Sequence, residues 1–63
     1  MSAIEMGFYI WNESKQKWLG NDEKSWTPSL FSAIEFDDPE YAKDIRSNVQ
    51  QEDICYILRV RFG

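Results

Sequence analysis

The final third of the chain shows the plainest alternation of apolar and polar positions. From Ile54 to Phe62 every even-numbered residue is apolar, whereas the odd-numbered positions end in Arg59 and Arg61. A period of two is typical of a strand with one buried face. We therefore expect a strand over 54–62 whose even-numbered side chains face the core. A slip of one residue would bury both arginines, so the register should be strongly specified.

The first half of the chain predicts a hairpin and a short third strand. Gly7–Trp11 is an unbroken aromatic and β-branched run, and Gln16–Leu19 returns after a polar turn at 12–15. This arrangement is typical of two paired antiparallel strands. Residues 27–31 are expected to form a turn or a short helical turn, and residues 32–36 a third strand.

Asp37–Asn48 is the one clear helix. Asp38 is the expected N-cap, because Pro39 suits the first helical position and keeps the residue before it out of the helical region. Glu40 adds negative charge beside the positive end of the helix dipole. The apolar stripe that follows at helical spacing consists of Tyr41, Ala42, Ile45 and Val49. The solvent-facing side is expected to carry Lys43, Asp44 and Arg46.

The order strand, strand, strand, helix, strand (β-β-β-α-β) predicts the α+β class. We expect a single domain over residues 1–63, in which one helix packs on one face of a small antiparallel sheet of three to four strands. The helix should cover the face made by Phe8, Ile10, Tyr56, Leu58 and Val60.

Composition narrows the possible chemistry. The 63 residues include one cysteine, Cys55, and no histidine, which excludes an internal disulfide and a Cys/His zinc site. Cys55 therefore has no histidine to activate it as a nucleophile, and the chain has no Gly-rich phosphate loop. Capping and solvation account for the carboxylates near the helix start. We therefore expect no catalytic activity, no cofactor and no metal.

The charge and the cysteine count bear on partner and location. A net charge of −4 argues against general nucleic-acid binding, which depends on basic residues. We see no signal peptide and no apolar run long enough to span a membrane, and a lone thiol suits a reducing compartment. We expect a cytoplasmic location and a protein partner rather than a nucleic acid or a membrane. The sequence leaves the oligomeric state open.

Two surfaces are candidates for partner binding. The outer face of the sheet combines aromatic and basic residues, as do interface hot spots and platforms that stack single-stranded bases; its expected members are Tyr9, Trp11, Ile57, Arg59 and Arg61. The structural alternative is a local cation–π pair that Trp11 makes with an arginine. The second surface is an acidic patch around the helix N-terminus and a nearby loop, made of Asp22, Glu23, Asp37, Asp38, Glu40 and Asp44. It would attract a basic partner, unless it is simply solvated.

A loose series of residues runs through the middle of the chain: Lys17-Trp18-Leu19, then Trp26-Thr27, Leu30, Ala33 and Phe36, and then an acidic helix start. Over residues 8–45 this series resembles small phage and prophage proteins. The resemblance implies a non-enzymatic protein that binds and blocks host machinery, such as a polymerase, a nuclease or a CRISPR effector complex, in the host cytoplasm. The long final strand with Arg59 and Arg61 departs from the pattern.

Three functional hypotheses follow. The leading one is a non-catalytic protein–protein interaction module, in its narrower form a phage-encoded inhibitor of a larger host complex or of CRISPR defence. The first alternative is a small protein that binds single-stranded nucleic acid or nucleotides through Tyr9, Trp11, Arg59 and Arg61. The second is a structural subunit or a self-associating protein held through an edge strand or the open sheet face.

Overall fold

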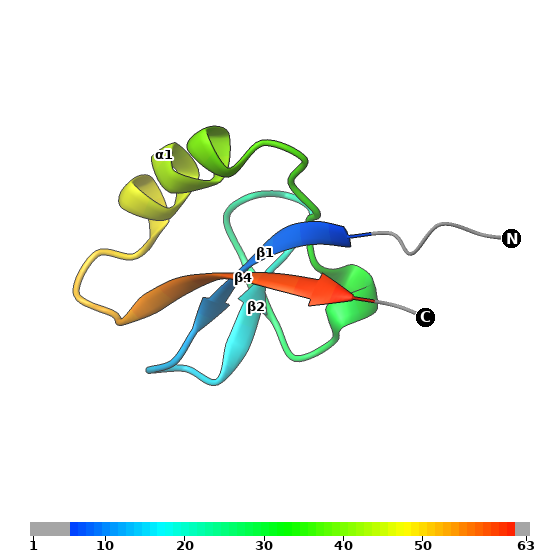
Figure 1. The fold of residues 1–63 in the computed structure, drawn as a ribbon. Helices are drawn as coiled ribbons and strands as arrows, with labels where there is room; N and C mark the ends of the chain where they lie inside the picture. Colours follow the sequence, from blue (N-terminus) through cyan, green and yellow to red (C-terminus); the bar gives the residue numbers. More distant parts are fainter. Residues whose placement is uncertain (1–5, 62–63) are drawn as a thin grey trace, which may run out of the picture.

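A four-stranded sheet and one α-helix make up the part of the chain that the structure describes. The structure is a computed structural model that describes residues 6–61, with side chains described for residues 7–60. The strands are β1 (Met6–Asn12), β2 (Lys17–Leu19), β3 (Trp26–Thr27) and β4 (Cys55–Arg61). They form one antiparallel sheet in the spatial order β3-β2-β1-β4, and helix α1 (Pro39–Val49) lies on one side of it (Figure 1). The predicted α+β fold, with one helix on an antiparallel sheet, is confirmed.

Helix α1 begins where the local sequence indicates. Asp38 is extended, and its Oδ1 accepts a hydrogen bond from the backbone N–H of Glu40 at 2.9 Å. Pro39 is the first helical residue, where its missing N–H leaves no bond unmade. The expected N-cap is confirmed, and the helix ends at Val49, one residue later than expected.

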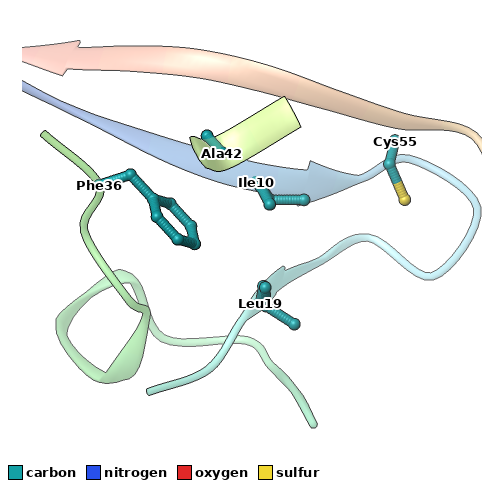
Figure 2. Close-up of a cluster of buried hydrophobic side chains, with 5 residues drawn as sticks. All are labelled: Ile10, Leu19, Phe36, Ala42 and Cys55. Atoms are coloured by element: carbon teal, nitrogen blue, oxygen red, sulfur yellow. The ribbon is translucent and has the colours of Figure 1, made fainter. Parts of the chain in front are cut away.

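The hydrophobic core lies between α1 and one face of the sheet. Ile10 of β1 and Leu19 of β2 are fully buried, and Ala42 of α1 packs in the same cluster (Figure 2). Phe36 and Cys55 complete the cluster. The helix contributes the expected apolar stripe to it, with partly buried side chains around Ala42 at Ile45 and Val49. Tyr41 contacts the ring of Phe36 but stays half exposed.

Arg46 differs from its expected place on the solvent-facing side of α1. Its side chain is partly buried, and its Nε is shielded from solvent with no hydrogen-bond partner among the described residues. Helix α1 packs against β4, and the positive charge of Arg46 lies close enough to Cys55 to lower the pKa of its thiol. Lys43 stays exposed as expected and forms an ion pair with Glu40 at 3.6 Å.

The face that β4 turns to the core is the reverse of the expected one. Ile10 is directly opposite Ile57, and Asn12 is opposite Cys55, so the odd-numbered residues of β4 share the helix-covered face. Three even-numbered side chains of the same segment are exposed, Ile54 by 56%, Tyr56 by 48% and Leu58 by 39%, and Val60 is partly buried.

The physical reason is that both sets of β4 side chains are largely apolar. Alternation alone therefore does not identify the core face, and pairing with β1 and coverage by α1 decide it. Arg59 lies on the helix-covered face without having its charge buried. Its guanidinium carbon lies 5.2 Å from the centre of the Phe8 ring, and the residue stays exposed. The predicted helix-facing set of Tyr56, Leu58 and Val60 was wrong.

The third strand was also predicted in the wrong place. β3 is Trp26–Thr27, and the short helical turn expected next is present as a 3-10 helix, η1 (Leu30–Ser32). Residues 32–36 make only two isolated bridges, one of them between Phe36 and Phe8. The backbone of Phe36 exchanges two hydrogen bonds with that of Phe8, at 2.9 and 2.8 Å. This segment therefore occupies the edge of β1 that the short β2 leaves uncovered, without continuing as a strand.

A buried amide joins the first hairpin turn to the connector before β4. Asn12 is fully buried; its Oδ1 accepts from the backbone N–H of Lys15 at 2.8 Å, and its Nδ2 donates to Asp53 Oδ2 at 2.8 Å. Beside it, the hydroxyl of Ser14 accepts from the backbone N–H of Ile54 at 3.0 Å. The bonds from Asn12 to Asp53 and from Ile54 to Ser14 connect residues about forty positions apart in sequence and hold β4 in register with β1.

Candidate functional site

The face of the sheet opposite α1 gathers large apolar side chains from three strands. We define the open face by five residues: Tyr9 and Trp11 of β1, Trp18 of β2, and Tyr56 and Leu58 of β4. Pairing across the strands makes them neighbours, because Trp11 is opposite both Trp18 and Tyr56, and Tyr9 is opposite Leu58. Residues directly opposite each other on one face of an antiparallel pair are in side-chain contact range.

Three aromatic rings of the open face pack against one another. The ring centres of Trp11 and Trp18 are 4.8 Å apart at an angle of 59°, and those of Tyr9 and Trp18 are 6.1 Å apart at 73°. The indole Nε1 of Trp11 donates to Glu13 Oε1 at 2.8 Å. Tilted and edge-to-face pairs of this kind stabilise aromatic clusters.

Tyr9 supports this face rather than forming its outer surface. It is only 5% exposed. Burial raises the pKa of its phenol, and the nearby carboxylate of Glu35 raises it further, so the neutral form is favoured. The Glu35 side chain lies over Gly7, where a Cβ would overlap it. The accessible part of the open face is therefore made of Trp11, Trp18, Tyr56 and Leu58, with Glu35 at its border.

The predicted mixture of aromatics and arginines on this face is not formed by the described side chains. Tyr9 and Trp11 lie there as expected, but Ile57 and Arg59 lie on the helix-covered face. This part of the prediction was wrong because it used the reversed orientation of β4. Arg61 ends β4, and its side chain lies outside the part that the structure describes.

Trp18, Tyr56 and Leu58 join the open face without having been expected there. Trp18 could have been found from the hairpin itself, because a turn over 13–16 brings Asn12 opposite Lys17 and hence Trp11 opposite Trp18. Tyr56 and Leu58 carried no such local signal, since their place depends on how β4 aligns with β1.

The predicted acidic patch separates into two regions. Asp38 caps α1, Glu40 pairs with Lys43, and Asp37 and Asp44 are exposed. Glu23 instead lines the same groove as Asn48 and Val49, which lie at the opposite end of a helix that rises about 15 Å from its first to its last residue. The six carboxylates therefore do not form one continuous site at the N-terminus of α1.

Asp22 has a structural role in its loop. Its carboxylate accepts from the backbone N–H groups of Lys24 and Ser25 and from the Ser25 hydroxyl, at 2.8–2.9 Å. These bonds lower its pKa to about 2. Such a carboxylate stabilises the turn in its ionised form.

An open groove of about 650 Å³ lies on the other side of the molecule from the open face. Its lining includes Lys15, Glu23, Lys24 and Trp26, together with the end of α1 and the connector after it. The Lys15 ammonium is 3.4 Å from Asp53 Oδ2, and two lining residues, Glu23 and Gln51, have φ of 61° and 51°. The charges of both signs in this groove are largely paired or exposed to water. Among the described residues, no group of three potential metal ligands is found.

Cys55 is buried at the edge of the core. Burial raises the pKa of its thiol, and the charge of Asp53 raises it further, while Arg46 and Lys15 act in the opposite direction. The thiolate form is therefore disfavoured. The described part of the chain contains no helix with the length and apolar character needed to cross a membrane.

Comparison with protein-family models, with curated proteins and with solved structures found no match to this chain. The geometry of its surfaces is therefore what bears on function. Of these, the open face is the one in which the fold brings together large side chains that α1 does not cover.

Proposed function

We propose that this chain is a non-catalytic protein–protein interaction module that binds its partner through the open face. The observation that carries the proposal is the side-by-side placement of Trp11, Trp18 and Tyr56 on the uncovered side of the sheet. Tyrosine and tryptophan are enriched in interface hot spots, because each buries a large area with few rotatable bonds. An apolar cluster of this kind on a small domain is typical of a binding surface.

Pre-organisation supports the same proposal. Trp18 packs against both Trp11 and the buried Tyr9, and Trp11 is further held by its hydrogen bond to Glu13. A surface whose side chains are already ordered loses less entropy on binding than a mobile one. The packing of Trp11 and Trp18 therefore supports the proposal in addition to the composition of the open face.

The charge around the open face favours a protein over a nucleic acid. Glu13 bonds to Trp11, and Glu35 lies beside Tyr9, so the described border is acidic. Arg59, which the nucleic-acid alternative required, lies on the other face of the sheet. Binding of single strands combines stacking with a basic groove along the backbone, and the described part of the open face supplies only the first.

The narrower form of the proposal is an inhibitor of host or defence machinery acting in the cytoplasm. It is supported by the resemblance of residues 8–45 to small phage proteins and by the net charge of −4. An acidic module suits a partner whose own surface is basic.

The proposal is tested by photo-crosslinking from two matched positions. Tyr56 on the open face and Tyr41 on α1 are both 48% exposed. Each is replaced in turn by p-benzoylphenylalanine, and the variants are irradiated in a lysate of the cells that express the chain. The expected result is a protein captured from position 56 and not from position 41. Excess wild-type chain should compete with the capture, whereas Leu58→Lys, confirmed as folded by circular dichroism, should compete poorly. Capture from position 41 alone, or equal competition by Leu58→Lys, would show that the open face is not the binding surface.

A further inference from the structure

Strand β4 leaves one long border of the sheet without a neighbouring strand among residues 6–61. It has seven residues and ends the spatial order, whereas the strand at the opposite border, β3, has two. In Figure 1 the orange-to-red β4 runs along this border, with α1 on one side of the sheet. An edge strand of this length presents a row of backbone donors and acceptors that another strand can pair with.

The hydrogen bonds of β1 show which groups of β4 point outward. Phe8 exchanges two hydrogen bonds with Phe36, so the N–H and C=O of Phe8 point away from β4. In an antiparallel ladder, hydrogen-bonded and non-hydrogen-bonded pairs alternate. Phe8 and Arg59 are therefore a non-hydrogen-bonded pair, and the N–H and C=O of Arg59 point to the outer border. By the same alternation, those of Cys55 and Ile57 also point outward.

Exposed apolar side chains lie along the same strand. Ile54, Tyr56 and Leu58 are three of the five large hydrophobic residues that are exposed in the described part of the chain. Edge strands are commonly protected by proline or by charged side chains. Residues 55–60 contain no proline, and their one charged side chain, that of Arg59, lies over the Phe8 ring of β1. It therefore leans toward the neighbouring strand and not over the border.

We propose that β4 pairs with β4 of a second copy of this chain, antiparallel and with Ile57 on the two-fold axis. In this register Ile57 lies opposite Ile57 of the second copy, and Cys55 lies opposite Arg59 of the second copy. The outward backbone N–H and C=O groups of both chains then meet as hydrogen-bonded pairs. On the open face, Tyr56 comes opposite Leu58 of the second copy. An axis at Arg59 would set two like charges opposite each other, which is destabilising.

The outer border of β4 matches a second copy because its backbone groups and exposed side chains are self-complementary in this register. Each outward donor finds an acceptor, and each exposed apolar residue of the seam finds an apolar one. The resulting sheet would have eight strands and would join the two open faces at Tyr56 and Leu58. This inference goes beyond the proposed function, since the pairing uses the outer border of β4 and the proposed binding uses the side chains of the open face.

The test measures molar mass by light scattering against concentration for wild type and two variants. Arg59→Pro removes an outward N–H without removing a bond to β1, and proline is tolerated at such edge positions. Arg59→Ala removes the same side chain and keeps the N–H. The wild type and Arg59→Ala should both approach twice the chain mass of 7.5 kDa as concentration rises. The two-fold axis repeats each hydrogen bond, so the dimer of Arg59→Pro lacks two of them. Its dissociation constant should therefore be at least about tenfold higher than that of Arg59→Ala.

A second measurement covers the case in which Arg59→Pro does not fold. In the wild type, amide exchange at Ile57 and Arg59 should slow as concentration rises, and exchange at Leu58, which already bonds β1, should change much less. A wild-type mass that stays at 7.5 kDa at all concentrations overturns the proposal. So does a dimer that Arg59→Pro leaves intact, or exchange at Ile57 that does not depend on concentration. A dimer lost in Trp18→Lys but kept in Arg59→Pro would place self-association on the open face instead.

Discussion

Replacing Asn12 by alanine should lower the stability of the fold by about 2 kcal/mol. The side chain is fully buried and makes two hydrogen bonds of 2.8 Å, one to the Lys15 N–H and one to Asp53. At about 1 kcal/mol for each bond, the two together give this figure. At the usual stability per residue, 63 residues correspond to a total of roughly 3–9 kcal/mol. The change should therefore remove a large part of the free energy of unfolding.

Urea unfolding followed by tryptophan fluorescence measures this loss. With a slope of about 1 kcal/mol per molar for a chain this small, the midpoint should fall by about 2 M. The matched control is Ser14→Ala, which removes another bond between the same two segments, at an exposed hydroxyl. Water replaces that bond, so the midpoint should move much less.

Two outcomes would refute this reasoning about the buried amide. The first is an Asn12→Ala midpoint that falls no further than that of Ser14→Ala. The second comes from Asn12→Asp, which keeps an acceptor for the Lys15 N–H but sets a carboxylate against Asp53. At neutral pH this variant should be no more stable than Asn12→Ala, because like charges that close repel. Wild-type stability in Asn12→Asp would contradict the arrangement of these groups.

Three further predictions test the two faces of the sheet and the loop after β2. Ile57→Ala should cost about 2 kcal/mol in urea unfolding and the 39% exposed Leu58→Ala clearly less, and the opposite order would contradict the orientation of β4. The pKa of Asp22 is lowered from 3.8 to about 2, so its stabilising contribution is complete above about pH 4 and is lost as the pH falls toward 2; Asp22→Asn should flatten stability over this window. Gly7→Ala should displace the Glu35 side chain and so lower the pKa of Tyr9, as measured by an ultraviolet titration. In a Glu35→Gln background, which has no charge at this position, Gly7→Ala should leave the pKa of Tyr9 unchanged.

The helix was predictable because its determinants are local. Asp38 and Pro39 define its start within two residues, and its apolar stripe repeats within a few turns. The hairpin was predictable for the same reason, with only small differences at the ends of its strands. The class of the fold follows from the order of these elements, since one short helix must cover an apolar sheet face.

The face of β4 was not predictable from alternation, because its information is non-local. Cys55 and Ile57 are apolar, and so are Tyr56 and Leu58, so either set satisfies the pattern of a half-buried strand. The choice is made by residues about forty positions away, where Asn12 bonds to Asp53 and Ser14 bonds to the N–H of Ile54. The third strand shows a similar limit. Phe36 makes one isolated bridge to Phe8, at the part of β1 that the short strand β2 does not reach. The length of β2 therefore decides where Phe36 can pair.

The orientation of β4 also decides which functional hypotheses the molecule supports. In the orientation of β4 expected from the sequence, Arg59 would lie on the same face as Trp11, and the two would form a stacking platform for nucleic acid. With the observed one, Arg59 covers Phe8, and the place beside Trp11 is taken by Tyr56. The surface changes from aromatic and basic to aromatic and apolar, with an acidic border at Glu35. The same change leaves Tyr56 exposed next to the outer border of β4, so a single strand links the proposed partner-binding face to the proposed site of self-association.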